Sequence, residues 1–203
     1  MTHSTTDLRT RRRLATEQEL HQAALRLMTE RGFAATTVDE IVAAAGVSQR
    51  TFFRYFATKE DAVLLGYREL DDAIDSLQVP GDPHSALEAL LLFHQDQLDR
   101  LAQDEADRYL LLQRLISTEP ALRDAVAARE LASMDRLRLR LQTQLPAAPP
   151  LTSRLIAEIA TAVLRVTFDH WRADPDGSVA ELPRLYRQVR VAAQTLVAPP
   201  RRQ

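Results

Sequence analysis

The sequence contains no cysteine and only five glycines among its 203 residues. Without cysteine, disulfide frameworks, thiol catalysis and cysteine-based zinc or iron–sulfur sites are excluded. Five glycines are too few for a β-rich fold built on tight turns. No apolar run approaches the ~18 residues of a transmembrane helix, and the charged N-terminus lacks the apolar segment of a secretion signal. We therefore expect a soluble helical protein of the cytoplasm, not attached to a membrane.

Lysine is almost absent as well, since Lys59 is the only lysine among 26 basic residues. Residues 1–59 carry nine basic and six acidic side chains, whereas residues 60–203 carry seventeen basic and twenty-two acidic ones. A basic N-terminal part joined to an acidic remainder indicates that only the N-terminal part meets a polyanion. The apolar fraction of 45% and the charged fraction of 27% are those of a globular chain of one or two domains.

Apolar residues recur at helical spacing from the first part of the chain onward. Leu20, Ala24, Leu27 and Met28 share one face and predict a helix from about residue 12 to residue 31. Gly32 follows it and suits the left-handed position after a helix end.

N-cap residues open the next three predicted segments. Thr37 and Glu40 have the spacing of a capping box, and Gly46 ends the short helix that follows them. Ser48 precedes a segment that is rich in phenylalanine, and Thr58 opens a longer helix. Proline and glycine at residues 80–83, and prolines at residues 146–150, separate further helical patterns. The whole chain is predicted to be all-α, with nine helices and no strand.

The segment 38–56 has the pattern of a helix-turn-helix, with Gly46 in the turn and Val47 directed into the core. In such a unit the second helix lies in the DNA major groove, and its N-terminal residues face base edges. Those residues are Gln49, Arg50 and Thr51. Arginine makes bidentate contacts to guanine, and glutamine makes them to adenine. A solvated helix start with no DNA partner remains the alternative on this pattern alone.

The stretch TTVDEIVAAAGVSQRTFFRYFATKEDAV, preceded by ALRLMTERGF, resembles the N-terminal DNA-binding domain of the TetR/AcrR family of bacterial transcriptional regulators. The resemblance spans roughly residues 10–66 without a gap. It implies an all-helical homodimer whose N-terminal domains bind a palindromic double-stranded DNA operator. It also implies that the C-terminal domains contain the dimer interface and a pocket for a small-molecule ligand. Binding of that ligand releases the protein from the operator.

The resemblance also implies roles for individual residues near the reading helix. Phe53 stands where many members carry tyrosine, so an apolar contact to a base or thymine methyl is expected in place of a polar one. Thr37, Tyr55 and Lys59 fall where the family contacts phosphates. Phe52 and Phe56 are expected in the core. The DNA-binding set is therefore Thr37, Ser48, Gln49, Arg50, Thr51, Phe53, Tyr55 and Lys59.

The basic run Arg11, Arg12 and Arg13 precedes this domain. It fits a solvated helix start as well as an arm that reaches the minor groove or the DNA backbone. The polar composition of the first residues predicts a disordered tail at 1–9. The remaining chain is expected to form a DNA-binding domain at 10–57, a connecting helix at 58–77 and a ligand-binding and dimerisation domain at 78–198.

The patterns LLLQRLISTEPALRDAV and VLRVTFDHW resemble the C-terminal domain of regulators like the mycofactocin regulator. Some members of that branch respond to fatty acyl-CoA thioesters, so an acyl-CoA-like ligand is expected. Ordinary bundle core is the competing interpretation of these Leu-rich faces, and His94 fits a buried core histidine better than a ligand contact. The candidate pocket residues are Leu90, Leu91, His94, Leu98, Leu111, Arg114, Leu115, Leu164, Phe168 and Trp171.

An enzyme and a helical protein-interaction module are the rival classes. The sequence has no Gly-rich phosphate loop, no GxSxG and no HExxH motif, and its five histidines are scattered. We therefore expect no catalytic residue, no metal site and no cofactor. An interaction module without DNA binding would account for the helices but not for the capped pair of short helices. A ligand-responsive DNA-binding repressor is the predicted function.

Overall fold

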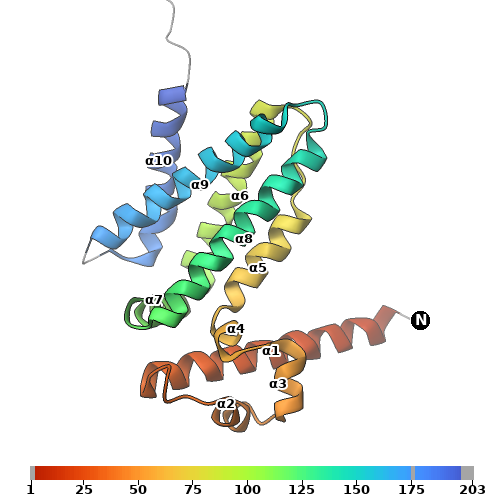
Figure 1. Ribbon diagram of the computed structural model, residues 1–203, viewed down its shortest axis with the longest axis vertical. Coiled ribbons are helices and arrows are strands. Elements are labelled where there is room, and N and C mark those ends of the chain that lie inside the picture. Colours follow the sequence, from red (N-terminus) through yellow and green to blue (C-terminus); the bar gives the residue numbers. More distant parts are fainter. Residues whose placement is uncertain (1–2, 175–176, 198–203) are drawn as a thin grey trace, which may run out of the picture. The chain divides into compact units, whose positions relative to one another are not determined.

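The computed structural model describes residues 3–174 and 177–197, and these contain helices and no strand (Figure 1). The predicted all-α fold is confirmed. The elements in chain order are α1 (His3–Arg31), α2 (Val38–Ala44), α3 (Gln49–Tyr55), α4 (Lys59–Val63), α5 (Leu65–Ser76), α6 (Pro83–Asp104), α7 (Ala106–Thr118), α8 (Pro120–Gln144), α9 (Pro150–Ala173), the 3-10 turn η1 (Val179–Glu181) and α10 (Leu182–Val197). None of the helices described is long and apolar enough to cross a membrane.

The chain forms two compact units. The N-terminal unit consists of Met1–Leu70 and Leu110–Arg129, and the C-terminal unit consists of Asp71–Tyr109 and Glu130–Gln203. The sequence assigned the whole of 78–198 to one C-terminal domain, whereas 110–129 packs with the N-terminal helices. The physical reason is burial, because Leu115 and Leu122 of this segment are 5% and 0% exposed within the N-terminal core.

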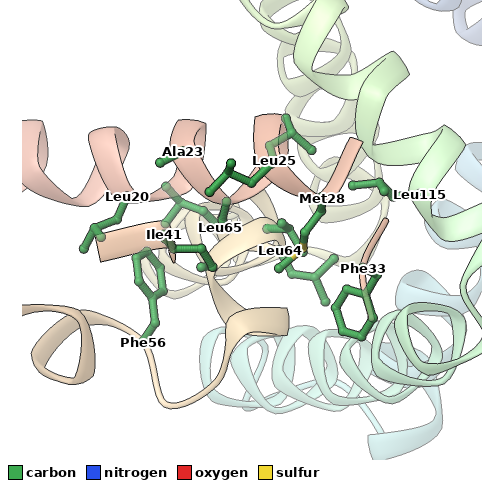
Figure 2. Packing of buried hydrophobic residues seen from close by; sticks show 14 of the residues in the cluster. Leu20, Ala23, Leu25, Met28, Phe33, Ile41, Phe56, Leu64, Leu65 and Leu115 are labelled. Atoms are coloured by element: carbon green, nitrogen blue, oxygen red, sulfur yellow. The ribbon is translucent and has the colours of Figure 1, made fainter. Parts of the chain in front are cut away.

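The core of the N-terminal unit gathers one apolar face from each of its helices (Figure 2). Leu20 and Met28 of α1 meet Ile41 of α2 and Leu64 after α4, and all four are fully buried. Burial of a side chain of this size contributes about 1.5–3 kcal/mol. Phe52 and Phe56 lie in the same cluster, as predicted, and Val47 packs against it. The short helices α2 and α3 are therefore held by tertiary packing, because isolated helices of seven residues are unstable.

Two helix boundaries differ from the prediction. Helix α1 begins at His3, so it includes most of the stretch that was expected to be a disordered tail. The helix expected from Thr58 onward is two helices, because Leu64 (φ −95°, ψ 25°) leaves helical geometry and α5 begins at the next residue. Leu64 and Leu65 are both buried, so core packing accounts for the break. This break raises the number of α-helices from the predicted nine to ten in the described part of the chain.

In the C-terminal unit, α6, α9 and α10 pack against one another. Tyr186 of α10 is fully buried and donates its hydroxyl hydrogen to the carbonyl oxygen of Leu91 on α6 at 3.0 Å. That bond satisfies the hydroxyl where it is out of reach of water, and burial raises the pKa of Tyr186. Apolar side chains remain exposed on α9 and α10, namely Leu151, Leu155, Val166, Val191 and Leu196.

Candidate nucleic-acid interface and ligand site

The first element of the candidate interface is the capped start of α2. The side-chain oxygen of Thr37 accepts from the backbone N–H of Glu40 at 3.3 Å, and Glu40 accepts from the backbone N–H of Thr37 at 2.9 Å. These bonds complete the capping box that the sequence predicted. The N–H of Thr37, with Arg31 at 3.1 Å as a lesser cause, holds the pKa of Glu40 below its ordinary value. Thr37 itself is exposed.

The turn between α2 and α3 depends on one glycine. Gly46 has φ +66°, a left-handed conformation that costs other residues about 1–2 kcal/mol. The next residue, Val47, donates its N–H to the carbonyl oxygen of Val42 at 3.0 Å. With Ile41 and Phe52 fully buried on either side of the turn, α3 is fixed on α2 as one rigid unit.

The start of α3 carries the predicted base-reading residues, of which Gln49 and Arg50 are exposed and Thr51 is half-buried. Ser48 is its N-cap, and its Oγ accepts from the backbone N–H of Thr51 at 3.2 Å. Phe53, one turn after Gln49, is 55% exposed. The carboxamide of Gln49 donates from Nε2 to Oδ1 of Asp39 on α2. The structure thus brings these side chains to one end of α3.

The far end of α3 is held by Arg68 of α5, a residue that the sequence did not single out. Its Nη1 donates to the carbonyl oxygen of Tyr55 at 3.1 Å, and its Nη2 bonds with Glu17 of α1, which is 7% exposed. The hydroxyl of Tyr55 accepts from Arg54 at 3.1 Å. Tyr55 is therefore placed by contacts at both its backbone and its phenol oxygen.

Lys59 makes contacts that were not predicted. Its Nζ donates to the carbonyl oxygens of Phe33 at 2.7 Å and Thr36 at 2.9 Å, and lies 4.3 Å from the centre of the Phe33 ring. These bonds join the start of α4 to the turn between α1 and α2. An ammonium group has three donors, and these two bonds use two of them. No local sequence signal marks this pairing, because the partners lie 23 and 26 residues away.

Arg11, Arg12 and Arg13 lie inside α1 and are exposed. Any contact that these side chains make to DNA would therefore come from a helix.

Comparisons with known proteins show the family of this chain. The profile of bacterial regulatory proteins of the tetR family matches residues 20–64. The HTH-type transcriptional regulator TcmR of Streptomyces glaucescens is 30% identical over 183 residues, which cover 83% of this chain and 79% of that protein. The chain belongs to the TetR family of bacterial regulatory proteins. As a TetR-family protein it is a DNA-binding transcription regulator with a helix-turn-helix.

Further relatives of this TetR-family chain extend the comparison. MftR of Mycobacterium tuberculosis (strain ATCC 25618 / H37Rv), described as a mycofactocin biosynthesis transcriptional regulator, is 31% identical over 117 residues, 55% of this chain and 57% of that protein. A solved TetR-family regulator from Syntrophomonas wolfei superposes with a TM-score of 0.57 at 18% identity, over 91% of this chain and 97% of that one. At that identity the superposition establishes the shared fold.

The predicted ligand-pocket residues of this TetR-family chain divide between the two units. Leu111, Arg114 and Leu115 belong to the N-terminal unit, where Leu115 is part of the core and Leu111 packs against it. The other seven lie on α6 and α9 of the C-terminal unit, where Leu90, Leu91, His94 and Leu98 are buried and Phe168 packs beside Trp171. A separate cavity of about 140 Å³ in this unit is lined by Met134, Asp135, Arg138, Arg154, Ala157 and Glu158.

His94 is 6% exposed and lies among these leucines. Burial lowers its pKa to about 4, although a hydrogen bond to the backbone of Ala160 opposes the shift. Its Nδ1 is buried with no hydrogen-bond partner among the described residues. The ring is therefore neutral at pH 7, with one acceptor that is left unsatisfied inside an apolar region.

Proposed function

We propose that this TetR-family chain is a repressor that binds a palindromic operator as a homodimer and is released by a small apolar ligand. The observation that carries the DNA-binding part is the rigid presentation of α3. Gln49 and Arg50 at its start are exposed, while its buried face packs in the core of the N-terminal unit. Its start is bonded to Asp39 of α2 and its far end to Arg68 of α5. A recognition helix needs this arrangement, because base contacts require defined side-chain positions.

We assign roles by position on this scaffold. Gln49, Arg50 and Thr51 read base edges, Phe53 supplies an apolar contact, and Ser48 holds the start of the helix. Phosphates are met by Thr37, Tyr55 and the remaining donor of Lys59. Arg11, Arg12 and Arg13 add positive charge near the backbone of the DNA.

Homodimerisation is assigned to the C-terminal unit. Leu151 and Leu155 on α9 and Val191 and Leu196 on α10 are each more than half exposed. Exposed apolar side chains on two neighbouring helices suit a symmetric interface, in which the same face of each copy packs on the other. A dimer places two reading helices on one duplex, which is why the operator is expected to be palindromic.

The ligand is assigned to the α6 and α9 residues of the C-terminal unit, with a fatty acyl-CoA as the proposed compound. The support is the resemblance of this region to acyl-CoA-responsive regulators, the apolar character of Leu90, Leu91 and Leu98, and the unsatisfied Nδ1 of the neutral His94. An acyl chain suits an apolar lining. The carbonyl oxygen of an acyl thioester can only accept a hydrogen bond, so it cannot satisfy Nδ1 of His94, which is itself an acceptor. A ligand hydroxyl or amide N–H would be needed to satisfy that acceptor.

Two titrations test this proposal. The operator is first selected from a library of random duplexes, and its affinity is measured at 50 and 200 mM salt against a shuffled duplex. We expect affinity to fall steeply with salt while preference for the selected duplex remains. Long-chain acyl-CoA is then titrated with and without operator. Because coupling is reciprocal, a true effector binds more weakly in the presence of operator by the same factor by which it weakens operator binding. Equal affinity in both conditions would exclude that compound as the effector.

A further inference from the structure

We infer that Asp39 is a positioning residue that sets the base preference of Gln49. This inference rests on the proposed role of α3 in reading DNA and extends it to a residue outside that helix. Asp39 is the second residue of α2 and Gln49 is the first residue of α3. Their side chains meet across the turn, with Nε2 of Gln49 donating to Oδ1 of Asp39.

The chemistry of the pair determines which way the carboxamide of Gln49 faces. An ionised carboxylate can only accept hydrogen bonds, so it must take the amide nitrogen of Gln49 and not the amide oxygen. The oxygen Oε1 and the second hydrogen on Nε2 are left for another partner. In a free glutamine the two ends of the amide exchange by rotation, and the side chain presents either a donor or an acceptor to a base.

The frame around the pair is rigid enough to hold this orientation. Ile41 and Phe52 are fully buried on α2 and α3, and the turn is closed by the bond from the N–H of Val47 to the carbonyl oxygen of Val42. Asp39 takes no part in the capping box of α2, which is formed by Thr37 and Glu40. Its side chain can therefore be changed without removing the cap.

The orientation selects among the four base pairs. Adenine presents an N6 amino donor and an N7 acceptor in the major groove, and these match Oε1 and the remaining N–H of Gln49. Guanine presents O6 and N7, both acceptors, which would face the amide oxygen and the nearby carboxylate. Adenine is thus favoured and guanine is disfavoured at the position that Gln49 reads. Asp39 also places a negative charge beside a polyanion, which weakens binding to every sequence.

These two effects give Asp39→Asn an unusual signature. Asparagine has the same shape but no charge, and its amide can accept or donate, so Gln49 is no longer held in one orientation. We expect Asp39→Asn to bind all duplexes more tightly than the parent chain and to discriminate less between adenine and guanine at one position of each half-site. A residue with a purely structural role would lower affinity and leave the base preference unchanged.

The experiment uses the full chain and the operator selected from random duplexes. The base pair that Gln49 reads is located first, as the position at which Gln49→Ala loses its preference. Operators with adenine or with guanine at that position are then compared. Affinities are compared for the parent, Asp39→Asn, Gln49→Ala and the double variant. Glu30→Gln is the charge-matched control, because Glu30 is exposed at the end of α1 and outside α3. We expect about tenfold adenine preference in the parent, a several-fold loss in Asp39→Asn, and no further loss when Asp39→Asn is added to Gln49→Ala. Glu30→Gln should leave the preference intact.

The possible failures are distinct from one another. Full adenine preference in Asp39→Asn, together with its loss in Gln49→Ala, would show that Gln49 reads the base without help from Asp39 and would overturn the inference. A selected sequence that Gln49→Ala leaves unchanged would overturn it too, because Gln49 would then read no base. If the parent selects no sequence at all, the proposed function itself is wrong.

Discussion

Arg50 is exposed on the first turn of α3, beside Gln49. If it makes a bidentate contact to guanine, Arg50→Ala will cost about 1–3 kcal/mol on the selected operator and relax preference at one base pair in each half-site. Arg50→Lys is the matched control, since it keeps the charge but loses the planar fork. It should retain the salt dependence of binding and lose the preference. Affinity measurements on operators with single-base changes test this prediction. An unchanged base preference in both Arg50→Ala and Arg50→Lys would show that Arg50 does not read a base.

Lys59 combines a structural role with the proposed phosphate contact. Lys59→Met removes a charged donor from the carbonyl oxygens of Phe33 and Thr36, which we expect to cost about 2 kcal/mol and lower the midpoint of thermal unfolding by about 4–8 °C. It should also weaken all DNA sequences equally and reduce the salt slope by about one per subunit. Circular dichroism melts and salt titrations measure the two effects separately. A lower salt slope at unchanged thermal stability would mean that the internal bonds contribute nothing.

His94 predicts a pH dependence of stability within the C-terminal unit. Its pKa is about 4 in the folded chain, below the ordinary value of 6.5 that it has when unfolded, so between these values the unfolded state binds more protons. Stability therefore falls as the pH drops below 6.5. We expect this one group to remove about 2 kcal/mol of unfolding free energy between pH 7 and pH 5. Urea unfolding at pH 7 and at pH 5 measures this loss, which should be smaller in His94→Leu than in the parent chain.

His84→Leu is the control for that experiment, because the side chain of His84 is 85% exposed. It should keep the pH dependence of the parent chain. If His94→Leu and the parent lost equal stability between pH 7 and pH 5, His94 would not be a buried neutral histidine.

At the scale of elements, the position of α3 depends on a contact from α5. Arg68 bonds both to the carbonyl oxygen of Tyr55 and to the buried carboxylate of Glu17. Arg68→Gln leaves that carboxylate without its ionic partner, and we expect a loss of about 2–3 kcal/mol in stability together with weaker operator binding. Adding Glu17→Gln removes the buried charge and should restore part of the stability. Chemical denaturation of the two single variants and the double variant measures this coupling. Additive losses would show that the two side chains act independently.

At the scale of the molecule, the proposed repressor acts as a symmetric pair. One reading helix per subunit requires a pseudo-palindromic site whose half-sites lie about one helical turn, ~34–36 Å, apart or slightly more. Leu155 is 59% exposed on α9, so Leu155→Glu should disrupt the dimer without unfolding the chain and should reduce operator binding strongly. Light scattering of the free protein and footprinting of the complex test this prediction. A monomer of the parent chain on a single asymmetric half-site would contradict it.

Much of the site was predictable because its determinants are local. The caps at Thr37, Ser48 and Thr58 bond to residues three positions later, so the pattern is visible in four consecutive letters. Gly46 was recognisable as the turn because few other residues adopt a positive φ. The contacts of Asp39 with Gln49 and of Arg68 with Glu17 were missed, since each joins residues that are ten or more positions apart and has no periodic signal.

The sequence by itself determined the all-α class, the order of most helices, the helix-turn-helix and the burial of Phe52 and Phe56, because helical periodicity and capping act over a few residues. Only the tertiary structure decided that 110–129 packs with the N-terminal helices, that Leu64 interrupts a predicted helix and that Lys59 is bound to the turn before α2. These features depend on which apolar surfaces meet and which carbonyl oxygens come within reach of a charge. Such distances exist only after the chain has folded.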